Sequence, residues 1–310
     1  MALDEATTTF LTESAKAGGP ALHEMTPAQA REMSAGLSAL YGPGPELPAV
    51  EDVAIEVENG SVPARVFTPE AATGIIVYFH GGGWVVGTLS GFDTLCRQLA
   101  ARTGRTVVLV EYRKAPEHRF PTAVADARAA LAWVGSRREQ LAAPGELVVA
   151  GDSSGGNLAA VLAQENGRHA TPAIDFQVLV YPVTAADFET DSYLDPANAL
   201  MLGREAMMTF WDHYVPDEQD RKDPAAAPLL GDVTHAPPAL VVLAEHDVLR
   251  SEGAAYAERL RDAGVAVEEH VVPGQMHGFF TFPNVLPGAA AGMDLVVDAL
   301  ARRQAAVPEG

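Results

Sequence analysis

Cysteine, positive charge and long hydrophobic runs are all scarce in this sequence of 310 residues. The single cysteine, Cys96, excludes an intrachain disulfide and so permits a reducing compartment. No apolar run is long enough to span a bilayer, and we expect no membrane partner. Residues 1–16 carry Asp4, Glu5 and Glu13 and lack the apolar stretch of a secretory signal. The sequence therefore predicts a cytoplasmic protein.

Basic residues are outnumbered: 21 lysines and arginines stand against 41 acidic residues, giving a net charge of −20. Such a field repels phosphate backbones, which argues against a nucleic-acid partner. A neutral small molecule is indifferent to this charge. No group of His, Cys, Asp and Glu has the spacing of a zinc site, so we expect neither a metal nor a cofactor.

Short runs rich in Val and Ile alternate with longer segments of helical periodicity. This alternation is typical of an α/β fold with a mostly parallel sheet covered on both faces, here as a single domain over residues 1–310. Eight strands are expected near Val53–Val57, Ala64–Thr68, Ile75–Phe79, Thr106–Tyr112, Leu147–Ala150, Ile174–Tyr181, Leu240–Ala244 and Val265–Val272. Helices are expected near Phe92–Arg102, Thr122–Gly135, Ser154–Gly167, Ser251–Gly264 and Ala289–Arg303.

Two further segments predict a helical cap above the carboxyl ends of the strands. Thr26 and Pro27 offer an N-cap and a first-turn proline for a helix running to about Tyr41. The long stretch between Tyr181 and Leu240 contains no strand pattern but does contain a helical segment, Gly203–Tyr214. We therefore expect a cap formed by about 1–46 and about 184–230.

Gly151-Asp152-Ser153-Ser154-Gly155 follows an expected strand and precedes an expected helix. G-x-S-x-G in this context is the turn that presents a nucleophilic serine, with glycines where strand and helix approach closely. A dinucleotide-binding loop is the main rival, but the G-x-G-x-x-G spacing is absent from this turn. The context therefore favours Ser153 as a nucleophile.

The run His80-Gly81-Gly82-Gly83-Trp84 ends another expected strand. Its backbone can direct several N–H groups at one point, which is what an oxyanion hole requires. The alternative interpretation is a flexible glycine loop.

A serine nucleophile needs a base, and the base needs a carboxylate that orients it. Asp247 and His277 follow the expected strands Leu240–Ala244 and Val265–Val272, so both lie at the carboxyl edge of the sheet in the order serine, acid, histidine. Glu245 is the reserve acid. The other candidate histidines, which we interpret as surface or structural residues, are His169, His246 and His270.

With these motifs placed, the sequence resembles the bacterial hormone-sensitive-lipase family of carboxylesterases, which have the α/β-hydrolase fold. The resemblance also rests on Tyr112–His118, Phe120-Pro121, Asp223-Pro224, Pro228-Leu229, Asp247–Gly253 and His277–Phe279. It implies a triad of Ser153, Asp247 and His277. It also implies an oxyanion hole formed by the N–H groups of Gly82, Gly83 and Ser154, with Gly81 adjacent and His80 bracing the loop. The family more often has alanine at position 154, where only the N–H is expected to act.

The resemblance further implies a pocket under the cap, with four aromatic candidates for its walls: Trp84, Tyr181, Phe210 and Trp211. Plain cap core is the alternative for these four. The expected function is hydrolysis of small esters with short- to medium-chain acyl groups through an acyl-enzyme. Another acyl bond (amide, carbamate or acetylated drug) and a non-catalytic small-molecule receptor are the alternatives, and His277 argues against the receptor. A homodimer is compatible with the sequence.

Overall fold

The computed structural model describes residues 2–141, 145–165 and 172–306, and its centre is an eight-stranded sheet. The strand order is β1-β2-β4-β3-β5-β6-β7-β8. β2 pairs antiparallel with β1 and β4, and the other neighbouring strands are parallel, as predicted. The strands are β1 (Ala49–Val57), β2 (Gly60–Thr68), β3 (Gly74–Phe79), β4 (Thr106–Val110), β5 (Glu146–Asp152), β6 (Phe176–Val180), β7 (Ala239–His246) and β8 (Val267–Met276).

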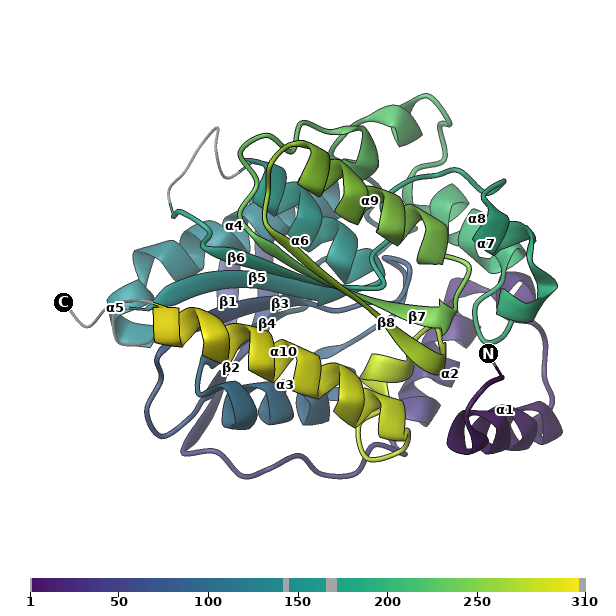
Figure 1. Cartoon of the computed structure of the whole chain (residues 1–310), viewed down its shortest axis with the longest axis horizontal. Coiled ribbons are helices and arrows are strands. Elements are labelled where there is room, and N and C mark those ends of the chain that lie inside the picture. Colours follow the sequence, from purple (N-terminus) through teal and green to yellow (C-terminus); the bar gives the residue numbers. More distant parts are fainter. Residues whose placement is uncertain (1, 142–144, 166–171, 307–310) are drawn as a thin grey trace.

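Helices cover both faces of this sheet (Figure 1). α3 (Leu89–Thr103) and α10 (Pro287–Ala306) lie on one face. α4 (Thr122–Ser136), α6 (Ser154–Glu165) and α9 (Arg250–Asp262) lie on the other, and the short α5 (Arg138–Leu141) follows α4. All five expected covering helices are present, although Gly167, the predicted end of α6, lies outside the described residues.

The strands divide their side chains between two hydrophobic cores. In β3, Ile75, Val77 and Phe79 face the core under α4, α6 and α9, whereas Ile76 and Tyr78 face the core under α3 and α10. Successive strand side chains point to opposite faces, so a strand buried on both sides reads as a continuous apolar run. This layered packing fixes the carboxyl ends of β3, β5, β7 and β8 at one edge.

Two helical segments lie together beyond that edge (Figure 1). The first contains α1 (Glu5–Ala17), η1 (Leu22–Glu24) and α2 (Pro27–Ser38). The second contains α7 (Asp191–Leu194), η2 (Pro196–Asn198), α8 (Arg204–Tyr214), η3 (Asp220–Lys222) and η4 (Pro228–Leu230). η1 packs against α8, so the segments touch. These are the segments that the sequence assigns to the cap.

The N-terminal end of α2 has the predicted cap: the Thr26 side chain accepts a hydrogen bond from the Gln29 N–H at 3.3 Å, and Pro27 is the first helical residue. α1 was not predicted. It docks on the end of β8 just before His277, where the Asp4 N–H donates to the Gly274 carbonyl at 3.1 Å. No helix within the described ranges combines the length and apolar character needed to cross a bilayer.

Candidate active site

Ser153 occupies the turn between β5 and α6 with a φ of 54°, in the left-handed region that non-glycine residues rarely adopt. The flanking glycines have a steric cause. A Cβ on Gly155 would lie 1.9 Å from the Phe79 carbonyl oxygen, and one on Gly151 would lie 2.4 Å from the Gly155 backbone. The strand-turn-helix context predicted from G-x-S-x-G is therefore present, with Ser153 at the carboxyl edge of the sheet.

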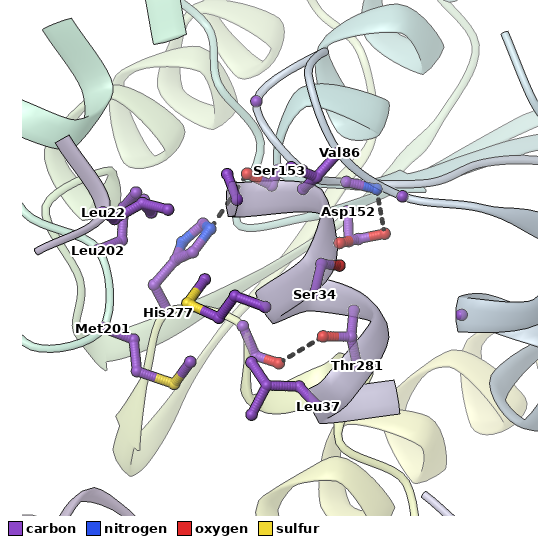
Figure 2. A pocket seen from close by; sticks show the side chains of 18 of the residues that line it. Leu22, Ser34, Leu37, Val86, Asp152, Ser153, Met201, Leu202, His277 and Thr281 are labelled. Atoms are coloured by element: carbon purple, nitrogen blue, oxygen red, sulfur yellow. Dashed lines mark hydrogen bonds between the residues drawn. The ribbon is translucent and has the colours of Figure 1, made fainter. Parts of the chain in front are cut away.

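His277 and Asp247 approach Ser153 from the ends of neighbouring strands, β8 and β7. The Nε2 atom of His277 lies 3.0 Å from the Ser153 Oγ, and its Nδ1 atom lies 2.8 Å from the Asp247 Oδ2. Figure 2 shows the imidazole directed at Ser153. Asp247 is fully buried, while the His277 side chain keeps 13% of its surface exposed. Three residues far apart in sequence thus form one chain of contacts.

The loop that carries Asp247 is tied down from two sides. The Leu249 N–H donates to the other carboxylate oxygen, Asp247 Oδ1, at 2.9 Å. Ser192 of α7 donates from its hydroxyl to the Val248 carbonyl at 2.6 Å and accepts from the Ser251 N–H at 3.1 Å. The second cap segment therefore braces the carboxylate that contacts His277.

The alternative acid and histidines have other partners. The Gly274 N–H donates to Glu245 Oε2 at 2.8 Å, and His270 Nε2 lies 2.7 Å from Glu268 Oε1. His246 lies beside Glu245, with 3.9 Å between its Nε2 and Glu245 Oε2. His169 lies outside the described residues. Among the described residues, the Ser153–His277–Asp247 arrangement is the one with consecutive contacts.

The glycine loop after β3 lies beside Ser153, and Gly82 and Gly83 adopt positive φ values of 116° and 57°. Their N–H groups donate to no acceptor in the described part of the chain. The Gly81 N–H instead donates to Asp152 Oδ1 at 3.0 Å, so the N–H of Gly81 is not available to a substrate. His80 has the predicted bracing position: its Nδ1 lies 2.8 Å from the Gly81 carbonyl oxygen.

Two neighbours of Ser153 hold this loop against the turn. Asp152 accepts from the Tyr78 hydroxyl at 2.8 Å as well as from Gly81, and burial raises the pKa of Asp152 to about 6 despite these hydrogen bonds. The Ser154 hydroxyl accepts from the Trp84 N–H at 3.2 Å. The sequence assigned a role to the Ser154 N–H alone, so the contact of its hydroxyl is a finding of the structure.

An apolar cavity of about 160 Å³ opens onto Ser153 and His277. Phe210 lines it, as predicted from the sequence. Trp84, Tyr181 and Trp211 do not, and each is fully buried. Trp84 stacks on Tyr214 with ring centroids 4.3 Å apart and meets Trp211 edge-on at 5.1 Å.

The physical reason for this correction is orientation. Phe210 and Trp211 are adjacent on α8 and so point about 100° apart, which lets only one of them face the cavity. Tyr181 instead packs its ring 4.6 Å from the His277 ring. Of these three aromatics, Tyr181 therefore supports His277, whereas Trp84 and Trp211 pack against each other in the core.

The first cap segment supplies much of the cavity wall, and the sequence did not identify these residues. Ser34 and Leu37 of α2 line the same cavity as His277 and Ser153 (Figure 2). Other lining residues include Ala30, Met33, Tyr41, Val86, Met201, Leu202, Met207 and Phe282. The N-cap Thr26 and the first-turn Pro27 predicted α2, but such end signals do not show against what a given face of the helix packs. In the described ranges no cluster of three His, Cys, Asp or Glu side chains could hold a metal ion.

Comparisons with known proteins agree with this geometry. A family model described as the alpha/beta hydrolase fold matches residues 76–281. The chain is 37% identical over 302 residues to the ethyl acetate hydrolase of Pseudomonas putida, covering 94% of this chain and 95% of that protein. It is 40% identical over 249 residues to carboxylesterase NlhH of Mycobacterium tuberculosis, covering 78% of each. The structure of the hyperthermophilic esterase from Pyrobaculum calidifontis matches with a TM-score of 0.91 at 34% identity, over 99% of this chain and 100% of that one. The chain therefore belongs to the alpha/beta hydrolase family, and within it to the hormone-sensitive-lipase-like carboxylesterases.

Proposed function

We propose that Ser153 is the nucleophile, His277 the general acid and base, and Asp247 the orienting carboxylate of this carboxylic ester hydrolase. The observation that carries the proposal is the contact chain Ser153 Oγ to His277 Nε2 at 3.0 Å and His277 Nδ1 to Asp247 Oδ2 at 2.8 Å. Both distances are within hydrogen-bond reach, which is the geometric requirement for proton transfer.

Each half of the reaction follows from these positions. His277 Nε2 takes the Ser153 hydroxyl proton as Oγ attacks the ester carbonyl carbon, and Asp247 stabilises the resulting imidazolium. His277 then returns the proton to the leaving alcohol as the ester C–O bond breaks. A water molecule attacks the acyl-enzyme with His277 as base, and Ser153 recovers its proton as the carboxylic acid leaves.

The tetrahedral intermediate carries a negative oxygen, and we assign its stabilisation to the N–H groups of Gly82, Gly83 and Ser154. The free N–H groups of the two glycines and the position of Ser154 in the first turn of α6 support this assignment. Loss of one such donor typically lowers turnover about 10²- to 10³-fold. Gly81 is left out because its N–H is engaged by Asp152.

The cavity supports small esters with short- to medium-chain acyl groups. Its volume of about 160 Å³ is close to that of an engineered cavity of roughly 150 Å³ that binds benzene. An acyl group of about six carbons therefore fills it, and a fatty acyl chain must extend beyond it. The printed name of the Pseudomonas putida relative, ethyl acetate hydrolase, agrees with a small ester.

A chain-length series of p-nitrophenyl esters, from acetate to laurate, tests this function. We expect kcat/KM to be highest for short and medium chains. Ser153→Ala is expected to lose about 10³-fold or more, because triad members act as a unit. Ser61→Ala, an exposed serine of β2, is the control and should match the native enzyme. Equal rates for Ser153→Ala and the native enzyme would place the chemistry elsewhere, and faster cleavage of the matching p-nitroanilides would identify an amidase.

The proposal also covers the compartment, the partners and the domain organisation of the enzyme. We infer a cytoplasmic enzyme that takes a small-molecule ester, because its single cysteine, Cys96, is compatible with a reducing compartment. The net charge of −20 argues against a nucleic-acid partner. We treat 1–310 as one domain whose cap comprises about 1–46 and about 184–230. A homodimer stays a prediction that light scattering can test.

A further inference from the structure

Arg31 of α2 joins the cap to the body of the enzyme through four hydrogen bonds. Its Nε donates to the Val85 carbonyl at 2.9 Å, and its Nη2 donates to the Ala115 carbonyl at 3.0 Å. The two remaining bonds are a forked pair with the Glu117 carboxylate, at 2.8 and 2.6 Å. A planar guanidinium presents its donors in a fixed fork, so these contacts fix its orientation as well as its position.

The carbonyl partners of Arg31 belong to two segments, since Val85 lies in the turn that follows the glycine loop and Ala115 lies in the loop after β4. The Val85 N–H donates to the Gly82 carbonyl at 3.0 Å, and the Ala115 N–H donates to the Trp84 carbonyl at 2.9 Å. Arg31 thus bridges two backbone segments that are already bonded to Gly82 and Trp84. A displacement of Arg31 therefore shifts the segment that carries the Gly82 and Gly83 N–H groups.

The helix that carries Arg31 is also a wall of the substrate cavity. Ala30, Met33, Ser34 and Leu37 of α2 all line it, and Figure 2 shows Ser34 and Leu37 at the cavity. The rest of the α2 surface is mostly exposed and only Ala30 is buried, so apolar packing alone holds this helix weakly. Arg31 is therefore the charged residue that anchors α2 to the residues around the glycine loop.

The hydrogen bonds from Arg31 to the two backbone carbonyls anchor α2 more strongly than its ion pair with Glu117 does. The side chains of Arg31 and Glu117 are 33% and 54% exposed, and exposed ion pairs of this kind are screened by water and salt. The bonds to Val85 and Ala115 are partly buried and are made by a charged donor, which strengthens them. Glu117 therefore orients the guanidinium, and the carbonyl contacts transmit its position.

We propose that Arg31 is a positioning residue that couples the cavity wall α2 to the glycine loop. Binding of the acyl group and alignment of the Gly82 and Gly83 N–H groups then both depend on the Arg31 guanidinium. The proposal rests on the function proposed above for Ser153, His277 and the glycine loop. Removal of Arg31 leaves both α2 and the glycine loop less firmly positioned. It weakens binding of acyl groups long enough to reach α2 and slows turnover of every ester.

The test compares p-nitrophenyl acetate and p-nitrophenyl hexanoate in the native enzyme and in Arg31→Ala. Rates are normalised to sites titrated with diethyl p-nitrophenyl phosphate, which phosphorylates the nucleophile and releases one p-nitrophenolate per site. For Arg31→Ala we expect kcat to fall about 3- to 10-fold for both esters, and KM to rise about 5-fold for hexanoate and less than 2-fold for acetate. A change in the hexanoate-to-acetate KM ratio is not produced by partial unfolding, which only lowers the number of titrated sites.

Three further variants sharpen the result. Arg31→Lys keeps the charge but loses the fork, and should recover only part of the hexanoate KM. Glu117→Gln should stay within 2-fold of native, because the exposed pair contributes little. Arg119→Ala removes an exposed arginine two positions from Glu117 whose side chain has no partner in the described part of the chain, and should leave both substrates unchanged.

Any one of three results would overturn the proposal. Two concern Arg31→Ala: an unchanged KM ratio, or an unchanged kcat per titrated site. The third is a loss in Glu117→Gln as large as that in Arg31→Ala. These outcomes are separable from failure of the proposed function. Suppose that diethyl p-nitrophenyl phosphate labels Ser153 and that Ser153→Ala is inactive, while Arg31→Ala behaves as the native enzyme does. Then only the proposed role of Arg31 is wrong. If the native enzyme is not labelled at Ser153, the assignment of Ser153 as the nucleophile is wrong.

Discussion

The Ser154 hydroxyl joins two motifs that are far apart in sequence, the serine turn and the glycine loop. Its Oγ accepts the Trp84 N–H at 3.2 Å, and both residues are fully buried. Trp84 itself has a φ of 58°, so its backbone is held in a region that costs free energy. A hydrogen bond at this point keeps the glycine loop at a fixed separation from the first turn of α6.

Ser154→Ala keeps the backbone N–H but leaves the buried Trp84 N–H without its acceptor. We expect the free energy of unfolding to fall by about 1–3 kcal/mol, the usual cost of an unsatisfied buried donor. We expect kcat to fall about 3- to 10-fold with little change in KM, because misaligned oxyanion donors weaken transition-state stabilisation. Urea unfolding and steady-state kinetics measure both, with Ser61→Ala as control. Native kcat in Ser154→Ala would show that the hydroxyl does not align the loop.

The sequence identifies single residues well where position in a parallel sheet decides their location. Asp247 and His277 follow strands, and the carboxyl ends of parallel strands meet at one edge, so their approach to Ser153 could be predicted. The pocket walls could not be predicted in the same way. Whether Trp211 or Phe210 faces the cavity depends on the rotation of α8 against its neighbours, which residue type does not encode.

At the scale of elements, the close contact between β3 and the start of α6 decides how the serine turn is built. A Cβ at Gly155 would lie 1.9 Å from the Phe79 carbonyl oxygen and 2.6 Å from the His80 carbonyl oxygen. Both obstacles are backbone atoms, so neither can rotate away. The helix can accept a side chain here only by moving off the sheet, and Ser153 would move with it.

Gly155→Ala should therefore lower the free energy of unfolding by about 3 kcal/mol or more, the upper range for overpacking a core. Any folded fraction should titrate poorly with diethyl p-nitrophenyl phosphate. Gly36→Ala is the matched control, since Gly36 lies in α2 with open space around its Cα, and it should stabilise the enzyme by up to about 1 kcal/mol. Similar unfolding midpoints for the two variants would contradict this account.

The elements themselves follow the sequence pattern closely, and the exceptions have physical causes. All eight strands were predicted, and the central ones, β3 to β7, are buried on both faces and so form nearly unbroken apolar runs. α1 was not predicted, and of its 13 residues only Thr7 is buried. Its position depends on contacts with the end of β8, such as the bond from the Asp4 N–H to the Gly274 carbonyl, which no local pattern reveals.

For the whole molecule, three buried ionisable groups have strongly shifted pKa values and so contribute to how stability changes with pH. Burial raises the pKa of Asp152 to about 6 and that of Glu252 to about 8. Burial lowers the pKa of His80 to about 4. A raised carboxyl pKa means that the folded state binds more protons, so stability falls as pH rises through that window. The lowered histidine pKa has the opposite sign, and stability falls as pH drops from about 6.5 to 4.

Between pH 6.5 and 8 the windows of Asp152 and His80 are complete, and Glu252 alone of the three still titrates. Glu252 of α9 accepts the Thr184 N–H at 2.7 Å and the Ala185 N–H at 3.4 Å, where the chain leaves β6 for the second cap segment. Its carboxyl group is protonated in the folded state at pH 6.5 and ionised in the unfolded state. The free energy of unfolding should therefore fall by about 2 kcal/mol over this interval, at about 1.4 kcal/mol per pH unit.

Glu252→Gln replaces the neutral acid by a neutral amide of the same shape, whose Oε1 can still accept the Thr184 and Ala185 N–H groups. Because the amide does not ionise, we expect this variant to lose the decline between pH 6.5 and 8 and to be more stable than the native enzyme at pH 8. Urea unfolding curves at half-unit pH steps measure the difference, and Glu258→Gln, an exposed position on the same helix, is the control. Parallel curves for Glu252→Gln and the native enzyme would mean that Glu252 does not hold its proton in the fold. The alkaline decline would then have to arise from another buried group.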